Sequence, residues 1–225
     1  GERTTPEQDK AMVEALFQDN RKKHEAVIYT HVHEDHIGLF DYVPKGIPQY
    51  LGEGAKEIIV EKYRLLCEAD KLSGNDPETN IRKHAKLKTF KTWPRSSKPE
   101  PFKIGDISIT PFYNCHSIYD SYMFLIEADG KRIWHTGDYR QHGWNGGKLL
   151  QLLRWKATDI DILITEGTML SRNDECITEK KVAFKLENVM RAFKYVFVLA
   201  SATDIERLAS INMAAKNAHK TLFVC

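Results

Sequence analysis

Three histidines and two acidic side chains lie within one short segment, His31-Val32-His33-Glu34-Asp35-His36. Histidines at positions i and i+2 project to the same side of an extended chain, so His31 and His33 can approach one ion together. A turn after them would bring Asp35 and His36 to a neighbouring position. Imidazoles and carboxylates at this density indicate a metal site, and one such loop could supply ligands to two adjacent ions.

Two further candidate ligands follow strand-like segments later in the chain. His116 lies in the polar segment 114–120, directly after the apolar residues 107–113, and Asp138 follows Gly137. The glycine lets the backbone turn, and an aspartate at such a turn can bridge two cations. Either feature alone is more often structural. Together with the histidine cluster, they favour a dinuclear site that activates water for hydrolysis.

The elements that would position these side chains follow from hydrophobic periodicity. Thr5 and Gln8 form a capping box at the start of the first helix, and Asp129-Gly130 predicts a tight hairpin turn. Helical spacing of apolar residues predicts helices at residues 6–20, 52–71, 179–193 and 204–218. Apolar runs and alternation predict strands at residues 26–30, 47–51, 87–92, 107–113, 122–128, 132–136, 160–165, 195–200 and 221–224. The alternation after residue 179 is typical of a parallel β-α-β layer.

The composition fits a globular protein. A chain of 225 residues is long enough for one large domain, and its 33 basic and 31 acidic side chains leave no excess charge that would name a partner. The four cysteines form no Cys-x-x-Cys pair and are expected to be reduced thiols. No apolar run approaches the ~20 residues that span a bilayer, and the first residues resemble no secretion signal. We therefore expect a cytoplasmic protein without membrane segments, and a truncated product, because the chain stops at Cys225 without a polar tail.

The order of the metal motifs resembles the metallo-β-lactamase fold. Thr30-His-Val-His-Glu-Asp-His-Ile-Gly38 is followed by Cys115-His-Ser-Ile118 and by His135-Thr-Gly-Asp-Tyr139. Asp161-Ile-Leu-Ile-Thr-Glu-Gly-Thr168 is similar to the acidic motif of the β-CASP nucleases, and residues 195–209 resemble the opening of the β-CASP insertion in ribonuclease J and its relatives. The resemblance implies an α/β fold in two parts. A partial metallo-β-lactamase-type αββα sandwich without its first strands would cover residues 1–175, and a truncated β-CASP-like domain, beginning β-α-β, would cover residues 176–225.

The resemblance also implies a set of zinc ligands. They would be His31, His33 and His116 for one ion, and Asp35 and His36 for the other, with Asp138 bridging the two. Asp35 would in addition orient the nucleophile, and Glu166, the acid that matches the β-CASP motif, would be the second catalytic residue. The closing histidine of the second site and the later β-CASP histidine motifs have no counterpart before Cys225, so the second zinc site is expected to be incomplete in this chain.

A basic run suggests the substrate. Residues 82–103 carry eight basic side chains against a single acidic one, with aromatic residues interleaved. A phosphate backbone favours such a surface, although a solvated face is the commoner cause of such a run. The candidate substrate contacts are Lys86, Lys88, Lys91 and, beside His116, Ser117.

Three functions remain open from the sequence. The first is a zinc-dependent β-CASP-type nuclease that cleaves RNA with a metal-activated hydroxide, which Glu166, the tail and the basic run favour. The second is a small-molecule hydrolase on the same fold, such as a thioesterase or lactonase, which would need no β-CASP insertion. The third is a non-catalytic subunit, against which the intact ligand motifs argue, because metal-binding side chains without a metal are a costly polar cluster. Homo-oligomerisation is left open.

Overall fold

The computed structural model describes residues 4–17, 26–93, 96, 98–171 and 176–224. Helix α1 (Pro6–Leu16) begins at the predicted capping box, where the Thr5 hydroxyl accepts a hydrogen bond from the Gln8 amide and the Gln8 side chain accepts one from the Thr5 amide. Phe17 caps the end of α1, so the helix is shorter than predicted. The remainder of the predicted helix, residues 18–20, lies outside the described residues.

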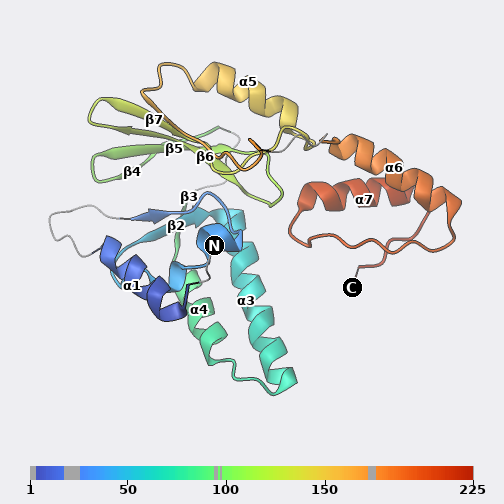
Figure 1. Cartoon of the computed structure of the whole chain (residues 1–225), viewed down its shortest axis with the longest axis horizontal. Coiled ribbons are helices and arrows are strands. Elements are labelled where there is room, and N and C mark those ends of the chain that lie inside the picture. The colour runs from blue at the N-terminus through green and yellow to red at the C-terminus, as the bar shows by residue number, and fades with distance from the viewer. Residues whose placement is uncertain (1–3, 18–25, 94–95, 97, 172–175, 225) are drawn as a thin grey trace.

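The first sheet is parallel and carries two helices on its outer face. Its strand order is β1 (Val27–Ile28), β2 (Gln49–Gly52), β3 (Lys91–Trp93). The connection from β2 to β3 contains α3 (Glu53–Ser73) and α4 (Glu78–Lys88), which lie side by side below this sheet in Figure 1. One apolar core joins the helices to the sheet, and it includes Leu51, Ala55, Ile59, Tyr63, Leu87 and Phe90.

The second sheet is mixed and follows the order β4-β5-β6-β7-β8. Its strands are β4 (Phe102–Ile104), β5 (Ile107–Tyr113), β6 (Tyr122–Ala128), β7 (Lys131–His135) and β8 (Ile162–Ile164). The first four pair antiparallel, and β8 joins β7 in parallel. The predicted hairpin turn is present, with positive φ at both Asp129 and Gly130, as a type I′ turn requires.

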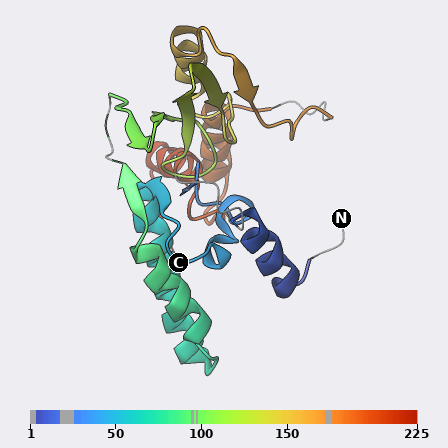
Figure 2. The same ribbon diagram turned by 90° about the vertical axis from the view of Figure 1, so that its left-hand side faces the viewer.

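The two sheets pack face to face, with helices on both outer sides. Trp93 of the first sheet packs with Ile109, Tyr122 and Phe124 of the second. Helix α5 (Gly146–Lys156) covers the other face of the second sheet, where its Leu149 joins a buried cluster around Trp134. Figures 1 and 2 show this order of layers from two directions. The predicted αββα sandwich of the metallo-β-lactamase type is therefore confirmed as a partial fold.

A buried carboxylate links the two sheets through hydrogen bonds. Asp120, which follows β5, accepts hydrogen bonds from the Ala55 amide in the first turn of α3 at 2.9 Å and from the Tyr122 hydroxyl at 2.8 Å. The Tyr122 amide in turn donates to the Thr30 carbonyl at 3.0 Å. Thr30 directly precedes residues 31–36, which carry three histidines and which we call the histidine loop. These contacts fix where the loops of the two sheets meet.

The last part of the described chain is a pair of helices. Helix α6 (Glu179–Ala192) begins at the Thr178 cap and α7 (Ile205–Asn217) at the Asp204 cap, and they lie side by side at the right of Figure 1. Their shared core includes Leu186, Met190, Leu208, Ile211, Ala214 and Ala215.

The predicted strands of this tail are wrong. Residues 195–200 and 221–224 have no strand structure, so the expected β-α-β layer is a helix pair with irregular connections. A strand needs a neighbour to pair its backbone, and within the described residues neither segment has one. The side chains of Phe197 and Leu199 are correspondingly 97% and 103% exposed.

Other differences from the predicted elements are local. The prediction of one strand at residues 87–92 is wrong in its first part, because α4 continues to Lys88 and β3 begins only at Lys91. Helices α4 and α5 and strand β4 were not predicted. Two short turns, α2 (Glu34–Ile37) and η1 (Phe40–Tyr42), follow the histidine loop. Among the described residues, no helix is long and apolar enough to cross a membrane.

Candidate metal centre

The histidine loop extends from β1 and then coils into α2. His33 is the N-cap of α2 with an extended backbone (φ −67°, ψ 146°), and His36 lies in the single turn that follows. His31 and His33 therefore project to one side, while α2 brings His36 back towards them. The ring centroid of His31 lies 4.7 Å from that of His33 and 4.1 Å from that of His36.

His116 and Asp138 arrive from the second sheet. His116 follows β5 and Asp138 follows β7, and these neighbouring loops face the histidine loop across the sandwich. His116 Nε2 lies 3.0 Å from His33 Nδ1, and Asp138 Oδ2 lies 3.2 Å from His36 Nε2. Residues more than 80 positions apart in sequence therefore form one cluster, as the motif order implied.

Two triads within this cluster have the geometry to hold a metal ion. Within each of them, the candidate ligand atoms all lie within 4.8 Å of one another, and the triads are His31, His33, His116 and His31, His36, Asp138. Asp35 belongs to neither triad. Its side chain is 78% exposed and its Oδ2 lies 3.5 Å from His36 Nε2, so the structure places it at the rim of the cluster.

The electrostatics of the cluster fit a cation. His31 is fully buried, its Nδ1 lies 2.9 Å from the Thr30 hydroxyl, and its Nε2 has no hydrogen-bond partner. Burial, reinforced by the neighbouring imidazoles, lowers the pKa of His31 to about 2. Burial and the adjacent His33 lower the pKa of His116 to about 4. Neutral imidazoles with free lone pairs are the form that binds metal, and a metal would satisfy the unpartnered nitrogen.

Hydrogen bonds to backbone carbonyls hold the two loops of the second sheet together. The Asn114 side chain donates to the carbonyls of Thr136 and Asp138 at 3.1 and 2.5 Å. The Arg140 amide donates to the Cys115 carbonyl at 2.7 Å. These contacts place the residues beside His116 against the turn that carries Asp138. The sequence analysis missed both Asn114 and Arg140, because neither is of a ligand type. The one signal for them is that each lies two positions from a candidate ligand in the sequence.

The turn that carries Asp138 depends on a glycine and on Glu166. Gly137 has φ +55°, and a Cβ there would lie 3.0 Å from the Thr30 side chain, so a larger residue would be both strained and crowded. Glu166, the predicted catalytic acid, accepts a hydrogen bond from the Tyr139 amide at 2.7 Å. The structure thus places Glu166 where it fixes the turn, outside both triads.

The four predicted substrate contacts differ in their exposure and in their hydrogen bonds. Ser117 is half-buried beside His116. Lys88 and Lys91 are exposed, with the Lys91 ammonium 5.5 Å from the Tyr50 ring centroid. Lys86 is half-buried, and its ammonium donates to the backbone carbonyls of Asp41 and Val43, at 2.7 Å each. Of the three lysines, Lys86 therefore has a structural contact for its ammonium, whereas Lys88 and Lys91 lie on the surface.

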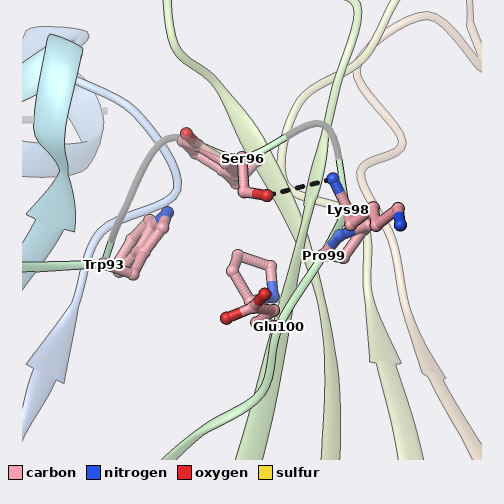
Figure 3. Close-up of a pocket in the computed structure, with 7 residues that line it drawn as sticks. Trp93, Ser96, Lys98, Pro99 and Glu100 are labelled. Atoms are coloured by element: carbon pink, nitrogen blue, oxygen red, sulfur yellow. Dashed lines mark hydrogen bonds between the residues drawn. The ribbon is translucent and has the colours of Figure 1, made fainter.

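A small pocket lies apart from the histidines. Its lining is Trp93, Ser96, Lys98, Pro99, Glu100, Pro111 and Tyr122, and Figure 3 shows Ser96 accepting a hydrogen bond from the Lys98 amide at its edge. None of the predicted site residues lines this pocket.

Acidification is expected to destabilise the metal-free protein. Unfolded histidines take up a proton near pH 6.5, whereas folded His31 and His116 do so only near their pKa values of about 2 and 4. Between these values the unfolded state binds more protons, so this stability is complete above about pH 6.5 and is lost as the pH falls. Each histidine should contribute a slope of up to about 1.4 kcal/mol per pH unit. Urea unfolding in a chelator at several pH values measures the slope, and equal stability at pH 7.5 and 5.5 would contradict it.

Comparison with known proteins gives one family match over most of the chain. Residues 8–198 match a family model described as the beta-lactamase superfamily domain. The matched range includes both sheets, the histidine loop, His116 and Asp138.

Curated relatives of this chain include ribonucleases. Ribonuclease J of Thermus thermophilus is 29% identical over 205 residues, which cover 88% of this chain and 34% of that protein. Endoribonuclease ysh-1 of Neurospora crassa is 28% identical over 153 residues, which cover 64% of this chain and 17% of that protein. The chain thus spans about a third or less of the length of these relatives.

A solved structure has the same fold. The crystal structure of a protein of unknown function from Enterococcus faecalis V583 superposes with a TM-score of 0.65 at 21% identity. The match covers 89% of this chain and 50% of that one.

Proposed function

The chain belongs to the beta-lactamase superfamily, and on this premise we propose that it acts as a zinc-dependent ribonuclease of the β-CASP type. The observation that carries the proposal is the convergence of three imidazoles and the Asp138 carboxylate around buried His31, whose Nε2 has no hydrogen-bond partner. The similarity to ribonuclease J and to an endoribonuclease supports RNA as the substrate.

In this proposal His31, His33 and His116 would hold one zinc ion, and His36 and Asp138 would be ligands of a second. Bound zinc would lower the pKa of a water molecule and neutralise charge on a phosphodiester. Asp138, close to both His36 and His116, is the ligand that would serve both ions. Asp35 is exposed next to His36, so its carboxylate can orient the attacking water and accept its proton. Glu166 keeps the Asp138 turn in place through the Tyr139 amide.

The division of the chain is part of the proposal. The sandwich would occupy residues 1–175, and residues 176–225 would begin a β-CASP-like domain. The separate apolar core of α6 and α7 supports a boundary close to Thr178, the cap of α6.

Chelation and metal restoration on the full-length protein test the activity. We expect cleavage of a labelled RNA to stop in EDTA and to return when zinc is added, with zinc in the purified protein measured by elemental analysis. Cleavage that continues in EDTA would contradict a metal-dependent mechanism. Hydrolysis of a small ester or lactone without RNA cleavage would favour the small-molecule alternative.

The exposed lysines give a prediction for RNA binding. Each phosphate contact with a single strand contributes about 0.7 to the slope of log affinity against log salt, so Lys88→Gln with Lys91→Gln should reduce that slope by about 1.4. Lys86 stays unchanged because its ammonium binds backbone carbonyls. The matched control is Lys148→Gln with Lys156→Gln on α5, where both lysines are also exposed. Equal slopes for the two double variants would assign Lys88 and Lys91 to a solvated face.

A further inference from the structure

A largely buried ionic network lies next to the loops that carry His116 and Asp138. It consists of Arg140, Glu179, Asp204, Glu206 and Arg207, and we call it the Arg140 network. The Arg140 side chain is only 9% exposed and that of Glu179 is fully buried. Charges at this depth must be paired, because an unpaired one would lose its hydration without compensation.

Arg140 binds the first turn of α7. Its two terminal nitrogens meet the two oxygens of Asp204 at 3.2 and 3.0 Å, and Nη2 also donates to Glu206 at 3.0 Å. Asp204 is at the same time the N-cap of α7, accepting from the Arg207 amide. Burial on its own would lower the pKa of Arg140, but the Asp204 and Glu206 carboxylates raise it. The guanidinium is therefore a fixed charge.

Glu179 connects the same network to α6. Its carboxylate accepts from Arg207 Nη2 at 2.8 Å and from the Ser210 hydroxyl at 2.7 Å, while its amide donates to the His142 carbonyl at 2.8 Å. The Trp144 indole donates to Ser210 at 2.9 Å. The segment that follows Asp138 thus binds the beginnings of both helices.

The other side of the network touches the loops that carry His116 and Asp138. Arg140 lies two residues after Asp138, and its amide donates to the carbonyl of Cys115, the neighbour of His116. The Cys115 thiol in turn points at the Glu206 carboxylate, 3.5 Å away. One arginine therefore contacts the His116 loop through its backbone and α7 through its side chain.

We infer that Arg140 is a positioning residue, which makes the geometry of His116 and Asp138 depend on the docking of α6 and α7. The inference rests on the proposed function, because it concerns how the same metal centre is kept in place. With the guanidinium removed, Asp204 and Glu206 would repel each other in a buried space, and α7 would withdraw from the loops. His116 and Asp138 would then lose the support that keeps their ligand atoms close together.

Zinc affinity of the full-length protein tests this inference. Arg140→Met keeps the length of the side chain but removes its charge, and we expect zinc binding to weaken about 10- to 100-fold, as for other residues that orient metal ligands. Zinc affinity is measured by competition with a coloured chelator, at a temperature well below the midpoint of thermal unfolding. Circular dichroism shows that each sample is folded. The Co²⁺ absorption spectrum reports the ligand geometry independently, and its visible bands should shift. Arg140→Lys, which keeps the charge, should recover part of the affinity.

Arg191→Met is the control, because Arg191 pairs with Glu187 within α6 and joins α6 to α7 through the Asn217 carbonyl, but neither contact involves the two loops. The Arg191→Met variant should bind zinc with the affinity of the wild type. If Arg140→Met does not fold, Glu206→Gln tests the same contact with an isosteric change and should weaken zinc binding in the same direction. Wild-type zinc affinity and Co²⁺ spectrum in a folded Arg140→Met or Glu206→Gln variant would overturn the inference. Zinc binding by the wild type without RNA cleavage would overturn the proposed nuclease activity and leave the Arg140 network standing.

Discussion

Replacing Asp138 by asparagine is expected to lower kcat for RNA cleavage at least about 1000-fold, because metal-based charge stabilisation is worth several kcal/mol and each 1.36 kcal/mol is tenfold in rate. Asp138 Oδ2 lies 3.2 Å from His36 Nε2 and 3.8 Å from His116 Nε2, so its charge is central to the candidate metal centre. The amide is nearly isosteric and leaves the turn at Gly137 unchanged. The fold should therefore persist while zinc binding and turnover are lost.

The control for this variant is Asp129→Asn. Asp129 is exposed in the hairpin between β6 and β7 with φ 50°, and asparagine is equally suited to that turn. Single-turnover cleavage of labelled RNA and zinc content are measured for both variants of the full-length protein. Cleavage by Asp138→Asn at a rate near that of Asp129→Asn would exclude Asp138 from the metal centre.

Gly52→Ala is expected to destabilise the protein by about 3 kcal/mol, the upper end of the overpacking range. Gly52 ends β2 directly before α3, and a Cβ there would overlap Asp120 Oδ2 and lie 2.5 Å from Tyr122 Cε2. Both side chains are buried and take part in the hydrogen bonds between the sheets. Relief of the clash would break the hydrogen bond from the Ala55 amide to Asp120 and leave buried groups unpaired.

Gly147→Ala is the matched control, because nothing lies within 4 Å of a Cβ at that helical position. Alanine there should be neutral or stabilise α5 by about 0.5–1 kcal/mol. Thermal unfolding should show a Tm about 10 °C lower for Gly52→Ala and no loss for Gly147→Ala. Equal Tm values for the two would show that Asp120 and Tyr122 can move without cost.

The sequence predicts those strands of the sandwich in which the local hydrophobic pattern agrees with the packing of the strand in the sheet. Strands β5, β6 and β7 carry apolar alternation and a type I′ hairpin, and the observed bounds differ from the prediction by at most one residue. Helix α3 was also predicted, but its inner face was not. Cys67 is buried, whereas Leu65 and Leu66 are 50% and 37% exposed. Hydrophobicity alone does not show which apolar residues face the sheet; that depends on the packing of α4, which the sequence analysis missed.

The tail shows the limit of periodicity. Residues 195–200 have the composition of a strand, but a strand forms only against a partner, and apolar composition says nothing about one. For the candidate metal centre, residue type predicted that the histidines and Asp138 lie together, but it equally selected Asp35, which lies at the rim of the cluster. The residues that hold these loops, Asn114 and Arg140, act through backbone carbonyls and distant carboxylates, which no local motif encodes.

The division of the ligands between two sheets sets an order of events in folding. Strands β4 to β7 are joined by short connections and can pair early, because their loops are cheap to close. The first sheet is parallel and needs two long crossovers, one of which carries His31, His33 and His36. We therefore expect each half of the ligand set to form in a separate folding event, and the set to be complete only when the sheets have docked. A metal ion binding there would arrive last, and would slow unfolding of the protein without accelerating its folding.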